Sequence, residues 1–365
     1  MKLSKFKWLF VLVVGSLALA GCVGVPPTSW PGVTASPDGK FVYVAYQTDV
    51  YKVDASNGNM VWKYPDPVDN SKAFYAAPAA SDTLVVFGDY QNEVFGTDPD
   101  KKQEPWKFSD SKDKILASAL ITGSLALVPS ADGNLYALNT ADGKLAWQFP
   151  TGGPLWGAPV IDSTGTDVYV ASMDHFLYAI KMSDHTLDWK VDLGASCLYG
   201  VTLAPDGNIY LATLANEVLA VSTTGHNIVW RYPTQSSPWA VPVFKDGVVF
   251  TADVNAADAS SQAYAINAKD GSKAWTVPIP GPVASSPAIT PNGLFFADEN
   301  GDVFTLNLSN GQRGNVNQKI GGKLYSAPVV AGDLVVVGVT TGDNNLLLVA
   351  YDFSGSQKWS FPIPK

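Results

Sequence analysis

Cysteine and histidine are scarce in this sequence, and their scarcity excludes several kinds of site. The chain has two cysteines, Cys22 and Cys197, and three histidines. Neither residue type shows the spacing of a metal site, and there is no Gly-x-Ser-x-Gly nucleophile elbow and no phosphate-binding glycine loop. We therefore expect no metal ion, no cofactor and no catalytic residue. Cys197 is expected to be a small buried apolar residue.

Basic side chains are also few, and long apolar runs are missing from most of the chain. There are 24 Lys and Arg against 33 Asp and Glu, which gives a net charge of −9. No polybasic patch is present, so nucleic acid is not expected as a partner. After Cys22 no segment is long and apolar enough to span a membrane, whereas an apolar content of 46% suits a globular core.

The exception is the beginning of the chain, residues 1–21. Three lysines precede an apolar run of 13 residues, from Trp8 to Ala20, and small residues follow it. This pattern is typical of a secretory signal peptide, because the run is shorter than the roughly 20 residues of a membrane-spanning helix. An uncleaved membrane anchor followed by a chance cysteine is the alternative.

The segment Leu19-Ala20-Gly21-Cys22 resembles the lipobox of bacterial lipoproteins. The resemblance implies cleavage before Cys22 and attachment of lipid to that residue. Two or more acyl chains hold a protein stably on a membrane. Residues 22–29 would then be a short lipidated tether, and the mature chain would carry a net charge of −12.

Tryptophan, by contrast, is frequent and periodic. Of 11 tryptophans, seven recur at intervals of 41–45 residues, with one interval of 84 residues that spans two periods. A period of about 40–45 residues is typical of a propeller blade with four short strands. We therefore expect eight units over residues 30–365, one of which has Asn315 in the place of its tryptophan. The recurring residues are Trp62, Trp106, Trp147, Trp189, Trp230, Trp275 and Trp359.

The unit that contains Trp147 shows the strands most clearly. Apolar residues alternate over Leu125–Val128 and Leu135–Asn139, and Asp142-Gly143 marks a tight turn. An innermost strand precedes them, often after a small residue and a proline, as at Ala158-Pro159. No segment has sustained helical periodicity, and no linker divides the chain. The sequence predicts an all-β, eight-bladed β-propeller of four-stranded antiparallel blades, with strands A to D and the tryptophan on strand D.

The segment from Tyr136 to Asn139, followed by Gly143 and Trp147, resembles the repeat of the PQQ-type, or quinoprotein-type, propellers. The likeness covers essentially Trp30 to Lys365 and implies that the repeated tryptophans dock neighbouring blades. It does not imply binding of PQQ, since many such propellers bind none. The adjacent cysteines and calcium ligands of the quinoprotein alcohol dehydrogenases are missing here. A PQQ-dependent oxidoreductase is the less favoured alternative.

Two further groups of polar residues are interpreted as parts of turns and not as metal-binding sites. The acidic segment from Asp298 to Asp302 falls at the expected B–C hairpin of repeat seven and lacks the remaining ligands of a calcium loop. We interpret it as a solvated turn. His185 and His226 replace the usual glycine of the C–D turn, so we expect both to be exposed.

A second set of aromatic residues shares one register at the start of the innermost strands. Strand direction alternates within a blade, so the D–A links lie on the same face as the B–C hairpins, including the long hairpin near residues 253–262. Loops of unusual length on a rigid scaffold commonly carry binding residues. The candidates for an aromatic-rimmed mouth that binds a partner are Tyr75, Trp156, Tyr199, Trp239 and Tyr325. Packing of these rings between blades is the alternative.

Length, anchor and repeat together are similar to those of the propeller lipoproteins of the outer-membrane β-barrel assembly machinery. The resemblance implies a non-catalytic scaffold that works as a monomer within an envelope complex and binds protein partners. A surface lipoprotein that binds a glycan or another polymer is the alternative. Because no aspartate follows Cys22, we expect the anchor at the periplasmic face of the outer membrane in a cell with two membranes. Otherwise it would lie at the outer face of the cytoplasmic membrane.

Overall fold

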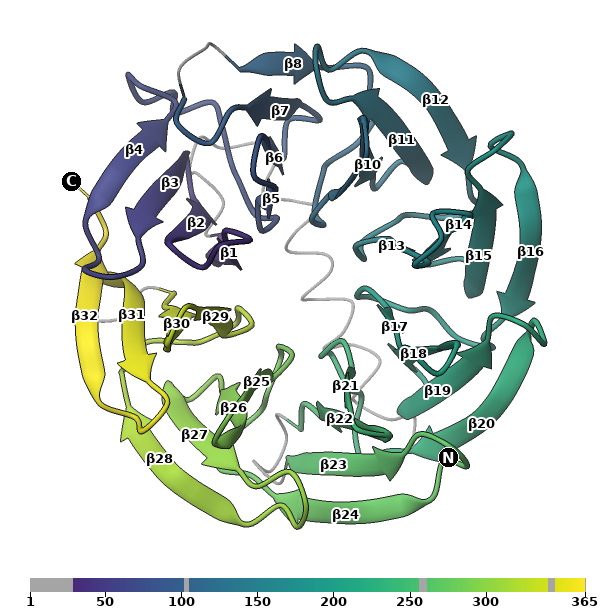
Figure 1. The fold of residues 1–365 in the computed structure, drawn as a ribbon, viewed down its shortest axis with the longest axis vertical. Coiled ribbons are helices and arrows are strands. Elements are labelled where there is room, and N and C mark those ends of the chain that lie inside the picture. Colours follow the sequence, from purple (N-terminus) through teal and green to yellow (C-terminus); the bar gives the residue numbers. More distant parts are fainter. Residues whose placement is uncertain (1–28, 102–104, 256–260, 341–344, 365) are drawn as a thin grey trace, which may run out of the picture.

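The chain folds into a ring of eight antiparallel sheets around a central axis (Figure 1). The computed structural model describes residues 29–101, 105–255, 261–340 and 345–364. Within these residues there are 32 strands and no helix, and each sheet contains four strands that are consecutive in the chain. The predicted eight-bladed all-β propeller is confirmed. None of the described residues forms a helix that would cross a membrane.

Each blade runs from strand A beside the axis to strand D at the outer edge. Blades I to IV contain β1 Gly32–Ala35, β2 Phe41–Tyr46, β3 Asp49–Asp54, β4 Met60–Tyr64; β5 Ala79–Ala80, β6 Val85–Gly88, β7 Val94–Thr97, β8 Trp106–Phe108; β9 Leu120–Thr122, β10 Leu125–Pro129, β11 Asn134–Asn139, β12 Leu145–Pro150; and β13 Val160–Ile161, β14 Asp167–Ala171, β15 Phe176–Lys181, β16 Leu187–Asp192. Blades V to VIII contain β17 Thr202–Leu203, β18 Asn208–Thr213, β19 Glu217–Ser222, β20 Asn227–Pro233; β21 Val243–Lys245, β22 Val248–Ala252, β23 Gln262–Asn267, β24 Lys273–Pro278; β25 Ala288–Thr290, β26 Gly293–Ala297, β27 Asp302–Leu306, β28 Arg313–Lys319; and β29 Val329–Ala331, β30 Leu334–Gly338, β31 Leu346–Asp352, β32 Gln357–Pro362.

The D-strand tryptophans lie between blades, where each packs against the C–D turn of the next blade. At Gly143 the turn has a φ of +70°, and a Cβ there would lie 2.3 Å from the Trp106 ring, so glycine lets this indole approach the turn closely without strain. Five indole N–H groups also donate to a carbonyl oxygen of that turn. The pairs are Trp62 with Pro99 (2.9 Å), Trp106 with Thr140 (3.0 Å), Trp230 with Ala268 (2.8 Å), Trp275 with Leu308 (2.8 Å) and Trp359 with Ala55 (2.8 Å).

Two junctions use a histidine in place of the turn glycine. His185 and His226 adopt positive φ angles and are exposed, as expected. Their imidazoles stack on Trp147 and Trp189, with ring centroids 4.8 Å apart in both pairs. A side chain at this position is therefore compatible with docking when it is flat and lies parallel to the indole.

Blade VII lacks the tryptophan, and the structure corrects which residue takes its place. The predicted residue, Asn315, is exposed on β28, whereas Val316 is buried and contacts Gly355 of blade VIII. Strand pairing gives the reason. Two extra residues bulge from β28 opposite Thr305, whereas one bulges from β12 beside Trp147. The longer bulge moves the inward-facing position one residue along the chain.

Candidate functional site

The aromatic register lies at the inner ends of the blades. In blade IV one row of paired residues runs from Val160 on β13 through β14 and β15 to Trp189 on β16. The residue four positions before the β13 member of this row is Trp156. The same count in blades II, VI and VIII gives Tyr75, Trp239 and Tyr325.

Blade I contributes an aromatic residue that the sequence comparison missed. Its row runs from Thr34 to Trp62, so the register position is Trp30. The Trp30 ring contacts the rings of Tyr75 and Tyr325, with centroids 5.6 and 6.1 Å apart. In blades II, IV, VI and VIII a proline stands three residues after the aromatic residue and marks the shared register, whereas Pro31 follows Trp30 directly. Strand pairing was needed to find it, because the interval from the register residue to the D-strand tryptophan varies from 31 residues in blade II to 36 in blade VI.

Tyr199 of blade V does not occupy the register position. Strand pairing assigns that position to Leu198, four residues before Thr202, because Gly200 stands two residues before β17 whereas Gly157 stands three residues before β13. Tyr199 nevertheless lies beside Trp156, where both residues line one pocket.

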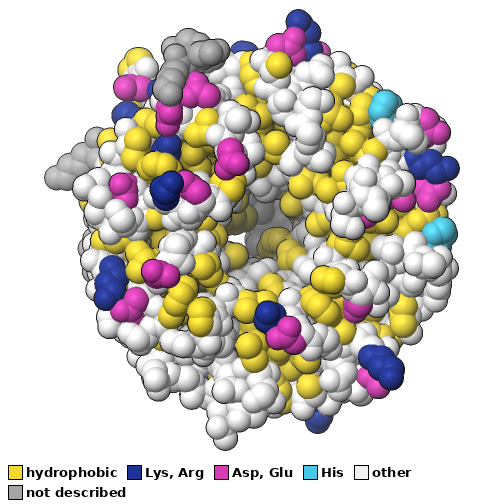
Figure 2. Space-filling view, viewed as in Figure 1, with side chains coloured by type: hydrophobic (Ala, Val, Ile, Leu, Met, Phe, Trp, Pro, Cys, Tyr) yellow, Lys and Arg dark blue, Asp and Glu magenta, His cyan; other side chains and the backbone are white. Residues whose placement is uncertain are grey.

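This pocket, of about 340 Å³, lies at the inner ends of blades II to VI. Its lining is largely apolar and includes Leu116, Trp156, Val160, Tyr199 and Val241. Hydrophobic side chains surround the central opening of the ring (Figure 2). We call this opening, with Trp30 and the five predicted aromatic residues, the mouth.

The aromatic residues of the mouth differ in exposure. Some are buried, as packing between blades requires, and others are exposed enough to contact a partner. Tyr75 is 4% exposed and contacts Trp30 and Tyr90, as expected of a packing residue. Trp30 is 41% exposed, and Trp156, Tyr199, Trp239 and Tyr325 are partly exposed. Whether these rings bind a partner stays a prediction.

Several buried polar atoms near the mouth have no hydrogen-bond partner among the described residues. They are the Tyr75 hydroxyl, the Trp156 indole N–H and the hydroxyls of Ser237 and Ser285. Burial raises the pKa of Tyr75 to about 12, so its phenol stays protonated and able to donate near neutral pH. Burial, with a smaller contribution from the charge of Glu299, also raises the pKa of Tyr199 to about 12. Unpaired buried donors are unfavourable, and a ligand with acceptor oxygens would satisfy them.

The acidic segment of blade VII is the predicted B–C turn, with Asn300 exposed and Asp302 partly exposed, but its first residue is not solvated as predicted. Asp298 is fully buried, and its Oδ1 accepts the backbone N–H groups of Asn300 and Asp302, both at 2.9 Å. Burial raises the pKa of Asp298 to about 6. These bonds fix the turn. Within the described ranges no three His, Cys, Asp or Glu side chains are grouped to hold a metal ion.

The remaining predicted residues fall into two groups. Cys197 is buried, its Sγ lies 3.0 Å from the carbonyl oxygen of Tyr199, and burial raises its pKa to about 12, so the thiol is not poised as a nucleophile. Cys22 and the hairpin tip at residues 256–260 lie outside the described residues.

Comparisons with known proteins agree with this architecture. Residues 23–187 and 177–360 match the family described as outer membrane protein assembly factor BamB. No curated protein sequence matches the chain. The crystal structure of BamB from Moraxella catarrhalis is 16% identical with a TM-score of 0.69, and the match covers 89% of this chain and 96% of that one. The computationally designed Ika8 protein is 12% identical with a TM-score of 0.68 and the same coverages. At these identities the structural matches show a shared fold.

Proposed function

The chain belongs to the family of the outer membrane protein assembly factor BamB, and we propose that it is a non-catalytic, lipid-anchored scaffold that binds protein partners during outer-membrane protein assembly. The observation that carries this proposal is the family match, which extends over nearly the whole propeller. The scaffold would work as a monomer within an envelope complex. Its ligand would be another protein, and it would need no cofactor.

In this proposal residues 1–21 are a signal peptide, residues 22–29 a tether and residues 30–365 the propeller. Lipid on Cys22 would hold the protein at the periplasmic face of the outer membrane, or at the outer face of the cytoplasmic membrane where that is the only membrane. Trp30 is eight residue steps from Cys22, which span about 30 Å at most. Since Trp30 belongs to the mouth, partners would bind close to the membrane surface.

The mouth is the partner-binding surface in this proposal. Aromatic side chains such as Trp30 and Trp156 bury a large area at little cost in side-chain entropy, which makes them effective anchors for protein partners. The unpaired donors of Trp156 and Ser237, two partly exposed residues, favour a partner that offers acceptor oxygens. The backbone carbonyl groups of an extended protein segment meet this need, because they combine acceptors with apolar side chains.

The distribution of reactive side chains supports a non-catalytic role. The Cys197 thiol is buried and protonated, and His185 and His226 lie on exposed turns, where they stack on structural tryptophans. Asp298 lies in the B–C turn of blade VII, where its Oδ1 accepts two backbone amides of that turn and its Oδ2 is buried without a partner among the described residues. No paired acid and base, and no nucleophile with a base beside it, occurs in this set of groups.

Recovery of partners from native membranes tests the proposal. The lipidated protein, affinity-tagged at its C-terminus, should recover outer-membrane assembly proteins, and Trp156→Ala combined with Trp239→Ala should abolish that recovery. Leu145→Ala is the matched control, because Leu145 is exposed at the outer edge of blade III. Recovery of a glycan or other polymer instead would support the alternative. Recovery of the same proteins by the double variant would refute the mouth as the binding surface.

A further inference from the structure

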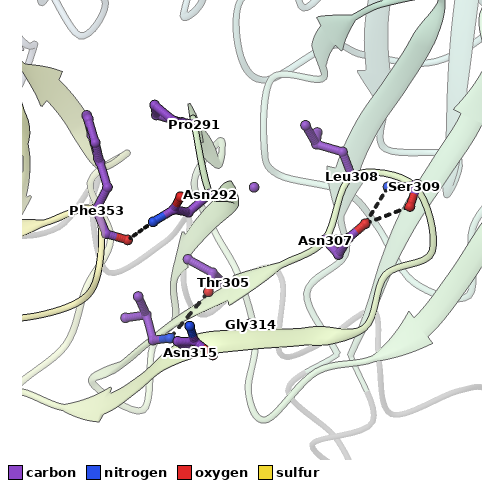
Figure 3. Close-up of a pocket in the computed structure, with 11 residues that line it drawn as sticks. Pro291, Asn292, Thr305, Asn307, Leu308, Ser309, Gly314, Asn315 and Phe353 are labelled. Carbon is purple, nitrogen blue, oxygen red and sulfur yellow. Dashed lines mark hydrogen bonds between the residues drawn. The ribbon is translucent and has the colours of Figure 1, made fainter.

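The junction between blades VII and VIII differs from the other seven, because no indole fills it. A pocket of about 470 Å³ opens there (Figure 3). It is lined by the A–B turn of blade VII at Asn292, by the C–D turn at Asn307, by Asn315 and Val316 of β28, and by Phe353 of blade VIII. Val316 and Phe353 stand where the tryptophan and its turn partner stand at the other junctions.

Two residues together make the contacts that an indole makes at the other junctions. Val316 supplies apolar contact with Gly355, the turn glycine of blade VIII. Asn292 donates its side-chain N–H to the carbonyl oxygen of Phe353 at 2.7 Å. In the preceding junction the indole N–H of Trp275 donates to the corresponding carbonyl, that of Leu308, at 2.8 Å. The junction is thus held together with less apolar volume than an indole provides, and space is left beside Val316.

We propose that this pocket binds an uncharged aromatic ring, of the kind that the tryptophan or tyrosine side chain of a partner protein presents. The lining residues carry no charge, so nothing there offsets the desolvation of an ionic ligand. Phe353 and Pro291 provide apolar contact, with the buried Val316 beside them. The Nδ2 of Asn292 already donates to Phe353, so the Oδ1 of Asn292 and the side-chain amide of Asn315 are the groups that would bind an N–H or O–H of the ring. A buried cavity of roughly 150 Å³ holds benzene, so this open pocket has room for a larger ring.

The position of the pocket makes it independent of the mouth. Pro291 and Asn292 belong to an A–B turn, and Asn307 and Phe353 belong to C–D turns. Strand direction alternates within each blade, so these turns lie on the face opposite the D–A links and B–C hairpins that surround the mouth. The propeller would therefore present one aromatic-rich surface and, on the other face, one receptor for an aromatic side chain.

Titration of the full-length protein with N-acetyl-tryptophanamide tests the proposal. We expect saturable binding, with backbone amide shifts in the NMR spectrum at residues 292–293, 305–309, 314–316 and 353. N-acetyl-alaninamide should give no such shifts. Absence of saturable binding by the wild-type protein, or shifts confined to other blades, would overturn the proposal.

Filling the pocket from within the chain provides the matched variant. Val316→Trp should weaken binding of N-acetyl-tryptophanamide at least tenfold, because the introduced indole would occupy the site. Val229→Trp places the same side chain on an exposed position of β20 and should leave binding unchanged. If Val316→Trp does not fold, the shift map of the wild-type protein still decides. Equal binding by wild-type protein and a folded Val316→Trp variant would refute the site.

Discussion

Trp359 donates its indole N–H to the carbonyl oxygen of Ala55 at 2.8 Å, although 304 positions separate the two residues in sequence. This bond joins blade VIII to blade I, which lie side by side where the ring closes (Figure 1). Both blades consist of consecutive strands, so the closure rests on packing. The apolar cluster around Val42, Leu348 and Phe361 contains residues of both blades, and the Ser326 hydroxyl donates to the Pro31 carbonyl oxygen. The ring closes with the same tryptophan contact that joins five of its junctions.

The closing bond can be measured by comparing two Trp→Phe changes. Trp359→Phe should lower the free energy of unfolding by about 1–3 kcal/mol more than Trp147→Phe, because it leaves the Ala55 carbonyl without its donor. Trp147 loses no such bond, since its N–H has no partner among the described residues. Urea unfolding of both variants provides the measurement. Equal losses would show that the Trp359 hydrogen bond contributes nothing to closure.

The position of Val316 predicts different outcomes for two neighbouring tryptophan substitutions. Val316→Trp should raise the melting temperature, because an indole would fill the space between blades VII and VIII. Asn315→Trp should change the free energy of unfolding by no more than about 0.5 kcal/mol, as is usual for an exposed position. Differential scanning calorimetry compares them. A gain for Asn315→Trp and a loss for Val316→Trp would show that β28 bulges differently.

Asp298 should make stability depend on pH. Burial raises its pKa to about 6 in the folded chain, so between its ordinary value and pH 6 the folded state holds more protons than the unfolded state. Stability contributed by the neutral carboxyl is therefore present at low pH and is lost as the pH rises through 6. At pH 7 the free energy of unfolding of Asp298→Asn should exceed that of the wild type by about 1–3 kcal/mol. At pH 3.5 the two values should be nearly equal. Asp82→Asn, on the exposed A–B turn of blade II, is the control. No difference between the two pH values would contradict this account.

Exposure separates two neighbouring aromatic residues of the mouth. Tyr75→Ala should cost about 3–5 kcal/mol of unfolding free energy, as is typical when a large aromatic residue is removed from a core. Trp30→Ala should cost less than half as much, because Trp30 is 41% exposed and Tyr75 only 4%. Trp30→Ala should instead reduce recovery of membrane partners at a temperature where the variant is fully folded. A large loss of stability with unchanged recovery would assign Trp30 to packing.

Lipid attachment is tested at a single atom. Cys22→Ser removes the thiol to which lipid would be joined, so cells expressing this variant should accumulate a precursor that takes up no fatty-acid probe. The Cys197→Ser variant serves as the control and should label normally, since Cys197 is buried between blades IV and V. Labelling of Cys22→Ser would exclude the lipobox interpretation.

The sequence by itself determined the number of blades and the strands within them. These follow from features that repeat locally: the spacing of the tryptophans, the alternation of apolar residues, and turns such as Asp142-Gly143. The sequence also predicted the shared register of Trp156 and Trp239, because each is followed three residues later by a proline that precedes strand A.

Tertiary structure alone decided the features that depend on two blades at once. Val316 rather than Asn315 faces the junction because of the length of a bulge in β28, and that length is set by how β28 packs against blade VIII. Trp30 belongs to the mouth because blade I meets blades II and VIII there, and Asp298 is buried because neighbouring segments, including Gly281, cover its turn. Local sequence patterns fix backbone conformation and direction, whereas burial and contacts between blades arise only when distant segments close the ring.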